Sequence, residues 1–255
     1  MKCAIMQPTY MPWLGYFSMI DQVDVFVFLD DVQLTKRSWQ VRNKLKSNDR
    51  ELMLTIPVKS SGDKARIKIN NADLDETSGW RESHLKSIKF NYSGSPYFTE
   101  VYTFIENLYS QPYTKLSEFN INFIKEICRK IGIDTTLINS SDIHTKFGTK
   151  DLMLASICVA VGANEYLAAI GSAKYIERYS PGGEIIKNSI DLYYQAYEHP
   201  IYFQKGNFVS YLGILDLLFN EGFRKSIDII RSGRRENIHY MKYRDLLIEG
   251  VKNEN

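Results

Sequence analysis

Cysteine is scarce in this chain, and its spacing fits neither disulfides nor zinc. The 255 residues include three cysteines, an odd number at wide separations: Cys3, Cys128 and Cys158. No CxxC, HExxH or HxH sequence occurs. These absences exclude a disulfide framework and argue against a zinc enzyme. We therefore expect three free thiols and assign no metal-ligating residues.

Neither a large net charge nor a long apolar run is present. The formal net charge is +2, which gives no basic footprint for duplex nucleic acid. No stretch approaches the ~18 apolar residues that a membrane helix needs, and no signal peptide is recognisable. We therefore expect no nucleic-acid partner, no membrane span and a cytoplasmic location.

Glycine-rich phosphate loops and the common nucleophile motif are also missing. No GxGxxG, GxxxxGK[ST] or GxSxG sequence is found. Neither of the two common phosphate loops nor a nucleophile elbow is therefore assigned. The sequence identifies no cofactor, and any ligand site must be built from other residues.

What is present is an alternation of strand and helix patterns. Residues 25–29 form a continuous apolar run, which is typical of a strand buried on both faces of a parallel sheet. Further strands are expected at 3–6, 51–58, 65–69, 135–139, 166–170 and 192–197, and helices at 17–23, 80–90, 97–109, 116–131, 151–161 and 211–219. This order predicts an α/β fold with a mainly parallel sheet flanked by helices.

The same pattern suggests one domain with two additions. Residues 1–230 are expected to form a single α/β domain, with a helical insertion at about 75–132. Residues 231–255 are a charged C-terminal tail that we expect to be partly helical or frayed.

Two polar segments follow the first two predicted strands. A right-handed crossover would place both segments at the carboxyl ends of neighbouring strands, where α/β sheets bind ligands. The first segment, Gln7 to Tyr16, combines two prolines with Gly15 and three aromatic residues. It is either a rigid loop that caps the core or one wall of a pocket.

The second segment, Asp30 to Asn43, brings opposite charges together. Asp30 and Asp31 end the buried run, and such carboxylates bind Mg²⁺ or act as a general base. Lys36, Arg37 and Arg42 follow, and arginines hold phosphates bidentately. The alternative is an ion-pair network without a ligand. We expect both segments to line one pocket, with the basic residues neutralising the carboxylates.

Histidine offers one further candidate. His199 stands in Tyr197-Glu-His-Pro200, directly after a predicted strand. The Glu-His pair suits proton transfer, although a histidine at a strand end is often structural. His84, His144 and His239 lie in no comparable context.

The two segments resemble the WbqC-like protein family. The resemblance rests on Gln7-Pro-x-Tyr-x-Pro-Trp-Leu-Gly-Tyr-Phe17, Val25-Phe-Val-Phe-Leu-Asp-Asp-Val-Gln33 and Lys36-Arg-Ser-Trp-Gln-x-Arg-Asn43. It continues through 84–89, 96–98, 194–195, 198–200 and 211–220. The chain departs from the family at Met6, where members often have histidine, and at Gly171-Ser-Ala-Lys174, where many have a glycine-rich element.

The resemblance implies a process in bacterial surface-polysaccharide (O-antigen, lipopolysaccharide) biosynthesis. It favours a transferase that adds an acyl or aminoacyl group to a nucleotide-linked amino-sugar. One alternative is an ATP-using nucleotidylyltransferase or ligase, although Trp13-Leu-Gly-Tyr16 keeps only the glycine of the HxGH loop of those enzymes. The other is a non-catalytic binding protein of the assembly machinery. The sequence defines neither donor, acceptor, metal dependence nor oligomeric state.

These arguments yield a set of candidate site residues. Catalytic roles are predicted for Asp30, Asp31 and His199. Substrate binding is predicted for Gln7, Tyr10, Trp13, Gly15, Tyr16, Gln33, Lys36, Arg37, Trp39, Arg42, Asn43, Ser172 and Lys174.

Overall fold

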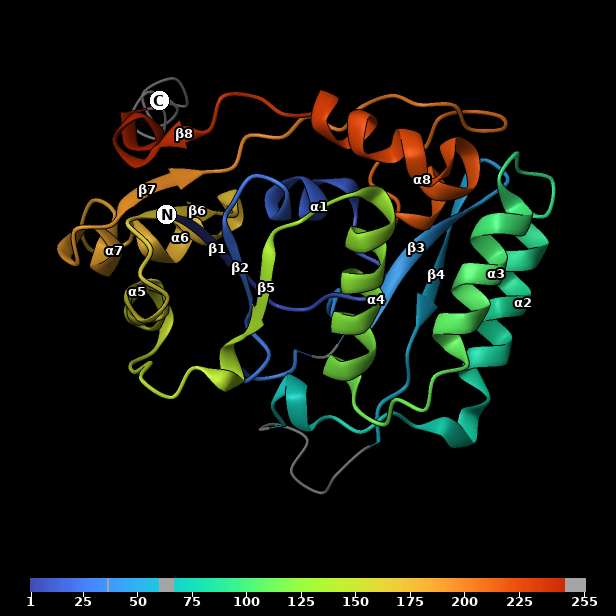
Figure 1. Cartoon of the computed structure of the whole chain (residues 1–255), viewed down its shortest axis with the longest axis horizontal. Coiled ribbons are helices and arrows are strands. Elements are labelled where there is room, and N and C mark those ends of the chain that lie inside the picture. Colours follow the sequence, from blue (N-terminus) through green and yellow to red (C-terminus); the bar gives the residue numbers. More distant parts are fainter. Residues whose placement is uncertain (36, 60–66, 246–255) are drawn as a thin grey trace, which may run out of the picture.

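Figure 1 shows the computed structural model, which describes residues 1–35, 37–59 and 67–245. Its strands are β1 (Lys2–Met6), β2 (Val25–Phe28), β3 (Arg42–Ser47), β4 (Arg50–Thr55), β5 (Thr136–Asn139), β6 (Glu165–Ala168), β7 (Asp191–Tyr194) and β8 (Ile238–His239). Its α-helices are α1 (Leu14–Ile20), α2 (Trp80–Tyr92), α3 (Phe98–Tyr109), α4 (Leu116–Ile131), α5 (Lys150–Ala160), α6 (Ala173–Ile176), α7 (Gly183–Lys187) and α8 (Leu215–Ser232).

The predicted α/β fold with a mainly parallel sheet is confirmed. The main sheet has the order β5-β2-β1-β6-β7-β8, and every pair in it is parallel except β7 with β8. Strand β2 is buried along its whole length, as its continuous apolar run predicts. In register, Cys3 pairs with Val25 and Met6 with Phe28, so β1 and β2 end level with each other.

Alternate side chains of strand β2 pack against helices on opposite faces of this sheet. Phe26 and Phe28 of β2 pack into one core cluster, which α1, α4 and α8 complete. Val25 and Val27 point to the opposite face and join a second cluster with α5, α6 and α7. Burial on both faces is what a doubly wound parallel sheet requires.

The strand order contains a switch of direction. From β1 the chain builds outward through β2 to β5, and then it crosses to β6 and β7 on the other side of β1. In open α/β sheets, ligands bind outside the carboxyl ends of the strands at such a switch point. The switch in this sheet lies between β1 and β6.

One sheet expectation was wrong. The strand expected at 51–58 was assigned to the mainly parallel sheet, but β3 and β4 form a separate two-stranded antiparallel hairpin. The hairpin turns at Asn48, whose φ of 54° lies in the left-handed region that asparagine tolerates. The strand expected at 65–69 lies partly outside the described residues. Lys68 makes an isolated bridge to Gln33, and Ile69 begins a short 3₁₀ turn.

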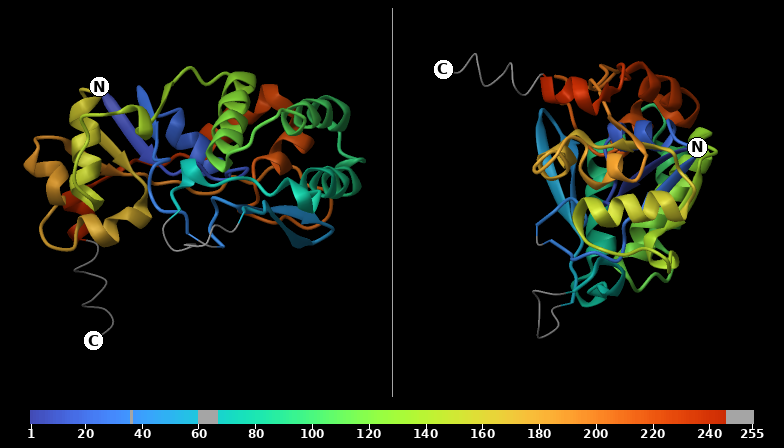
Figure 2. Two further views of the ribbon diagram at one scale, coloured as in Figure 1. Left: turned by 90° about the horizontal axis from the view of Figure 1, so that it is seen from below. Right: turned by 90° about the vertical axis from the view of Figure 1, so that its left-hand side faces the viewer.

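Three helices, α2 to α4, occupy the segment between the hairpin and β5. Helix α4 has the predicted ends, Leu116 and Ile131, and stops at Gly132, whose φ is 80°. Helix α8 continues well beyond the expected 211–219, with a break at Gly222, whose φ is 73°. Figures 1 and 2 show the main sheet with α5–α7 at one end of an elongated molecule and the hairpin with α2 and α3 at the other.

The described part of the C-terminal tail packs on the sheet. Strand β8 pairs with β7 through Tyr193–His239 and Tyr194–Ile238. Arg244 adds an ion pair of 3.3 Å to Glu177. Among the described residues, no helix has the length and apolar character needed to cross a membrane.

Candidate functional site

The candidate site lies at the carboxyl edge of the parallel strands. Gln7 follows β1, Asp30 and Asp31 follow β2, Ser140 follows β5, and Gln195 follows β7. Because β1 and β2 are parallel neighbours, the two N-terminal polar segments leave the sheet side by side. This adjacency is the geometric basis on which a shared pocket was expected.

Asp30 is held by the turn that follows β5. Its side chain is 3% exposed, and both carboxylate oxygens accept hydrogen bonds from Ser141. The Ser141 amide donates to Oδ1 at 2.9 Å, and the Ser141 hydroxyl donates to Oδ2 at 2.7 Å. The backbone carbonyl of Asp30 accepts from the Asn70 amide at 2.8 Å. Asp30 therefore ties β2 to its neighbouring loops.

Asp31 is more open and carries the ion pair of this edge. The Ser140 hydroxyl donates to Oδ1 at 2.5 Å, and the Lys146 ammonium lies 3.0 Å from Oδ2. Burial raises the pKa of Asp31, but the hydrogen bond from Ser140 and the charge of Lys146 outweigh it and hold the pKa below its usual value. The arrangement keeps an ionised, partly accessible carboxylate.

Lys146 was missed by the sequence analysis, which looked for the cation among residues close to Asp31 in the chain. Lys146 also donates to the carbonyls of Ser140 and Ile143. It reaches Asp31 because β5 pairs with β2, which brings the residues after both strands together. The only sequence signal for this ion pair was a basic residue shortly after the predicted strand at 135–139.

Hydrogen bonds join the two N-terminal segments to each other. The Gln40 side-chain amide donates to Gln7 Oε1 at 2.5 Å, and the Tyr10 amide donates to the Trp39 carbonyl at 2.9 Å. The buried Asn43 donates from Nδ2 to the Tyr10 carbonyl at 2.9 Å. The two segments therefore meet, with Gln40 as a contact that the sequence did not indicate, and a pocket lined by both stays a prediction.

Tyr10 and Tyr16 point into the core rather than toward the surface. Tyr10 is fully buried, and its hydroxyl lies 2.9 Å from His84 Nδ1 and next to the Tyr109 hydroxyl. Tyr16 is 2% exposed and donates to the Gln7 carbonyl at 3.1 Å. In this structure both rings anchor the segment Gln7 to Tyr16 to the core.

The predicted cations differ in their surroundings. Lys36 lies outside the described residues. Arg37 is exposed and has a φ of 56°, in the left-handed region. Arg42 is half-buried, and its Nε is buried without a hydrogen-bond partner. Within the described residues neither arginine has a carboxylate partner, so no ion pair occupies the guanidinium of Arg42.

Trp13 is the centre of an aromatic cluster. Its ring lies 6.4 Å from that of His199 at an interplanar angle of 13°, and it also contacts Tyr197 and Tyr211 at 5.4 and 5.5 Å. Gly15 makes room for the indole, because a Cβ there would lie 2.3 Å from Trp13 Cη2. Tyr197 and Tyr211 were not predicted as site residues.

His199 does not form the expected pair with Glu198. Glu198 binds Arg235 at 2.6 Å, whereas His199 Nδ1 lies 2.9 Å from the Pro200 carbonyl. The Nε2 of His199 is buried without a hydrogen-bond partner, and burial lowers the pKa of the ring. Any proton transfer by His199 would therefore use Nε2 and not a carboxylate relay.

The remaining candidates are dispersed around the edge. Ser172 follows β6 at the switch point, and its hydroxyl donates to the Ala169 carbonyl at 2.6 Å. Lys174 is exposed in α6, Gln33 is exposed in the loop after β2, and the 49% exposed Trp39 lies under the Lys44 ammonium at 5.7 Å. Within the described ranges, His, Cys, Asp and Glu side chains form no group of three suited to a metal.

Comparison with known proteins identifies the family of the chain. Residues 7–227 match the WbqC-like protein family. The chain belongs to this family. It is 33% identical over 226 residues to the uncharacterized protein Rv1507c of Mycobacterium tuberculosis, and the alignment covers 87% of this chain and 94% of that protein. No solved structure matches the chain.

The family match defines which parts of the molecule belong to the WbqC-like unit. It begins at Gln7, at the carboxyl end of β1, and ends at residue 227 within α8. It therefore includes the carboxyl edge, the hairpin and the helices α2 to α4. The described tail from β8 onward lies beyond it.

Proposed function

We propose that this WbqC-like protein is a cytoplasmic transferase of bacterial surface-polysaccharide biosynthesis. Its substrate is a nucleotide-linked amino-sugar, and the group transferred is acyl or aminoacyl. The observation that supports this most is Arg42, a half-buried guanidinium with an unpartnered Nε and no carboxylate partner among the described residues. A diphosphate is the ligand chemistry that fits such a group.

Residues of other segments supply the remaining groups that this reaction needs. Trp13 and the 54% exposed Tyr211 offer ring surfaces for a base or sugar. Attack of the sugar amine on the acyl carbonyl forms an N–C bond, expels the donor's leaving group and releases a proton. Asp31 suits the role of proton acceptor better than Asp30, because Asp31 is partly exposed whereas Asp30 is buried at 3% exposure.

A product assay tests the proposal. Nucleotide-linked amino-sugars are incubated with acyl and aminoacyl donors, and products are identified by mass spectrometry. We expect a product with the wild type and a loss of at least about tenfold in Arg42→Lys, since lysine lacks the bidentate fork. Arg224→Lys, at an exposed arginine of α8, is the matched control. No product across the panel together with no sugar-nucleotide binding would contradict the proposal.

The strand order favours a second candidate, an ATP-using nucleotidylyltransferase or ligase. The order β5-β2-β1-β6-β7 has the switch point of nucleotide-binding doubly wound sheets, next to the Gln7–Tyr16 segment. This activity requires Mg²⁺-dependent ATP binding and release of pyrophosphate. If calorimetry detects no binding of ATP in the presence of Mg²⁺, this second activity is excluded. If a folded Asp31→Asn variant fully restores surface-polysaccharide synthesis to cells that lack the protein, a non-catalytic binding protein is favoured instead.

A further inference from the structure

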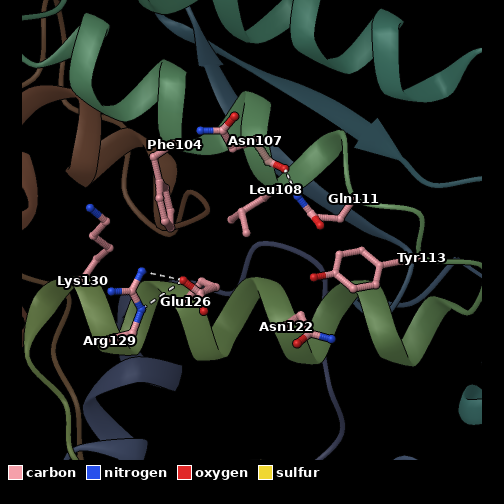
Figure 3. A pocket seen from close by; sticks show the side chains of 9 residues that line it. All are labelled: Phe104, Asn107, Leu108, Gln111, Tyr113, Asn122, Glu126, Arg129 and Lys130. Atoms are coloured by element: carbon pink, nitrogen blue, oxygen red, sulfur yellow. Dashed lines mark hydrogen bonds and ion pairs between the residues drawn. The ribbon is translucent and has the colours of Figure 1, made fainter.

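A cavity of about 440 Å³ lies between α3 and α4, outside the carboxyl edge of the sheet. Figure 3 shows its lining, which comes from α3, α4 and the segment that joins them. The lining residues that bear on binding are Phe104, Leu108, Gln111, Tyr113, Asn122 and Lys130. Its volume falls within the roughly 300–1,000 Å³ of small-molecule sites.

One end of this cavity carries an uncompensated positive charge. The Lys130 ammonium lies 5.5 Å from the ring centre of Phe104 and 5.6 Å from that of Phe223. It has no carboxylate partner in the part of the chain that the structure describes. The nearby Glu126 is already paired with Arg129 at 2.7 Å. The charge of Lys130 is therefore available to an anionic group.

The other end offers neutral hydrogen-bonding groups. The side-chain amide of Asn122 donates to the Glu118 carbonyl at 2.8 Å, and that of Gln111 donates to the Asn107 carbonyl at 3.1 Å. The side-chain oxygens of both amides accept no hydrogen bond from the described residues, and the Tyr113 hydroxyl also has no partner there. Free amide oxygens and a phenol suit the hydroxyl groups of a polyol.

We propose that this cavity binds a monosaccharide that carries one anionic group, a carboxylate or a phosphate. The anion lies beside Lys130, and the sugar hydroxyls bind Gln111, Asn122 and Tyr113. The apolar face of the sugar ring packs on Phe104 and the buried Leu108 between the two ends (Figure 3). This site is separate from the proposed transferase site and does not depend on that reaction.

Calorimetry on the full chain tests the proposal with three probes: glucuronate, glucose 1-phosphate and neutral glucose. We expect at least one charged probe to bind at least about tenfold more tightly than glucose. Which charged probe binds distinguishes the carboxylate from the phosphate. Lys130→Gln should abolish the preference for charge, and Tyr113→Phe should weaken binding of the charged probe. Lys130 is exposed, so its substitution removes only the two ring contacts of the ammonium and should leave the protein folded, as thermal melting checks.

Two controls separate this site from the rest of the molecule. Lys89→Gln removes an exposed lysine of α2 and should bind like the wild type. Arg42→Lys alters the proposed transferase site and should also leave binding intact. The proposal is overturned if neither charged probe binds the wild type at millimolar concentration, or if glucose binds as tightly. It is also overturned if Lys130→Gln and Tyr113→Phe bind like the wild type, or if Arg42→Lys is the change that abolishes binding.

Discussion

Ser141 holds the carboxylate of Asp30 with its backbone amide at 2.9 Å and its hydroxyl at 2.7 Å. The two residues follow β5 and β2, which are parallel neighbours. A buried carboxylate with both oxygens satisfied fixes the geometry of the loops that carry Asp31 and Lys146. The carboxyl edge therefore has a structural acid beside an accessible one.

This division predicts that Asp30→Asn mainly lowers stability. In the variant, Oδ1 can still accept from the Ser141 amide and the side-chain amide can donate to the Ser141 hydroxyl, but two charge-assisted hydrogen bonds become weaker neutral ones. We expect a loss of about 1–3 kcal/mol in the free energy of unfolding, measured by urea denaturation. Asp134→Asn, at an exposed position without a hydrogen bond or ion pair among the described residues, is the control and should change stability little. An unchanged urea midpoint for Asp30→Asn would show that Ser141 does not depend on the carboxylate.

A second prediction concerns Lys146→Gln. Removing the ammonium takes away a charge that lowers the pKa of Asp31, so this pKa should rise, as measured by carbon-13 NMR of the carboxyl group. The pKa of Asp31 is lowered in the folded wild type, so this pairing stabilises the fold above the unfolded pKa of about 3.9 and is lost as the pH falls through the folded value. The stability difference between wild type and variant should be full at neutral pH and shrink in acid. Lys89→Gln should show no such pH dependence, and an unshifted Asp31 in Lys146→Gln would exclude the ion pair.

Local patterns in the sequence predicted the elements better than the contacts between them. Helix α4 was predicted to both ends because its apolar spacing and Gly132 are local signals. The hairpin was missed because its turn at Asn48 lies within a charged segment. The pairing of Asp31 with Lys146, and of Trp13 with Tyr211, depends on which strands are neighbours and on a long loop before α8. No local spacing encodes such contacts.

His84 provides a prediction on pH and stability. Burial lowers its pKa from 6.5 to about 4, so the unfolded chain binds a proton at His84 over a range where the folded chain does not. Stability should therefore fall as the pH drops from about 6.5 to about 4, by roughly 3 kcal/mol at most. Urea denaturation at several pH values should show a flatter profile for His84→Gln than for the wild type. His144→Gln, at an exposed histidine, should keep the wild-type profile; equal profiles for both variants would exclude His84 as the cause.

Gly15 and Gly171 form a matched pair for testing the aromatic cluster. A Cβ at Gly15 would lie 2.3 Å from the Trp13 indole, whereas one at Gly171 meets no atom within 4 Å. Alanine normally stabilises a helix relative to glycine, so Gly15→Ala should be favourable unless the indole must move. We expect a loss of about 1 kcal/mol and an altered near-ultraviolet circular dichroism spectrum. Gly171→Ala should leave the spectrum unchanged, and a stabilised Gly15→Ala with the wild-type spectrum would show that Trp13 is not held there.

Substitution of Arg37 distinguishes a structural role of this residue from a ligand-binding role. It is exposed, has a φ of 56° and makes no contact with a carboxylate among the described residues. Lysine bears the same left-handed strain, so Arg37→Lys should change the free energy of unfolding by less than about 0.5 kcal/mol. If Arg37 binds a phosphate, the loss of its bidentate fork should weaken sugar-nucleotide binding about tenfold while the melting temperature stays the same. A fall in stability with binding retained would mean that Arg37 holds the loop. A variant that melts and binds like the wild type would remove Arg37 from the site and leave Arg42 to hold the phosphate.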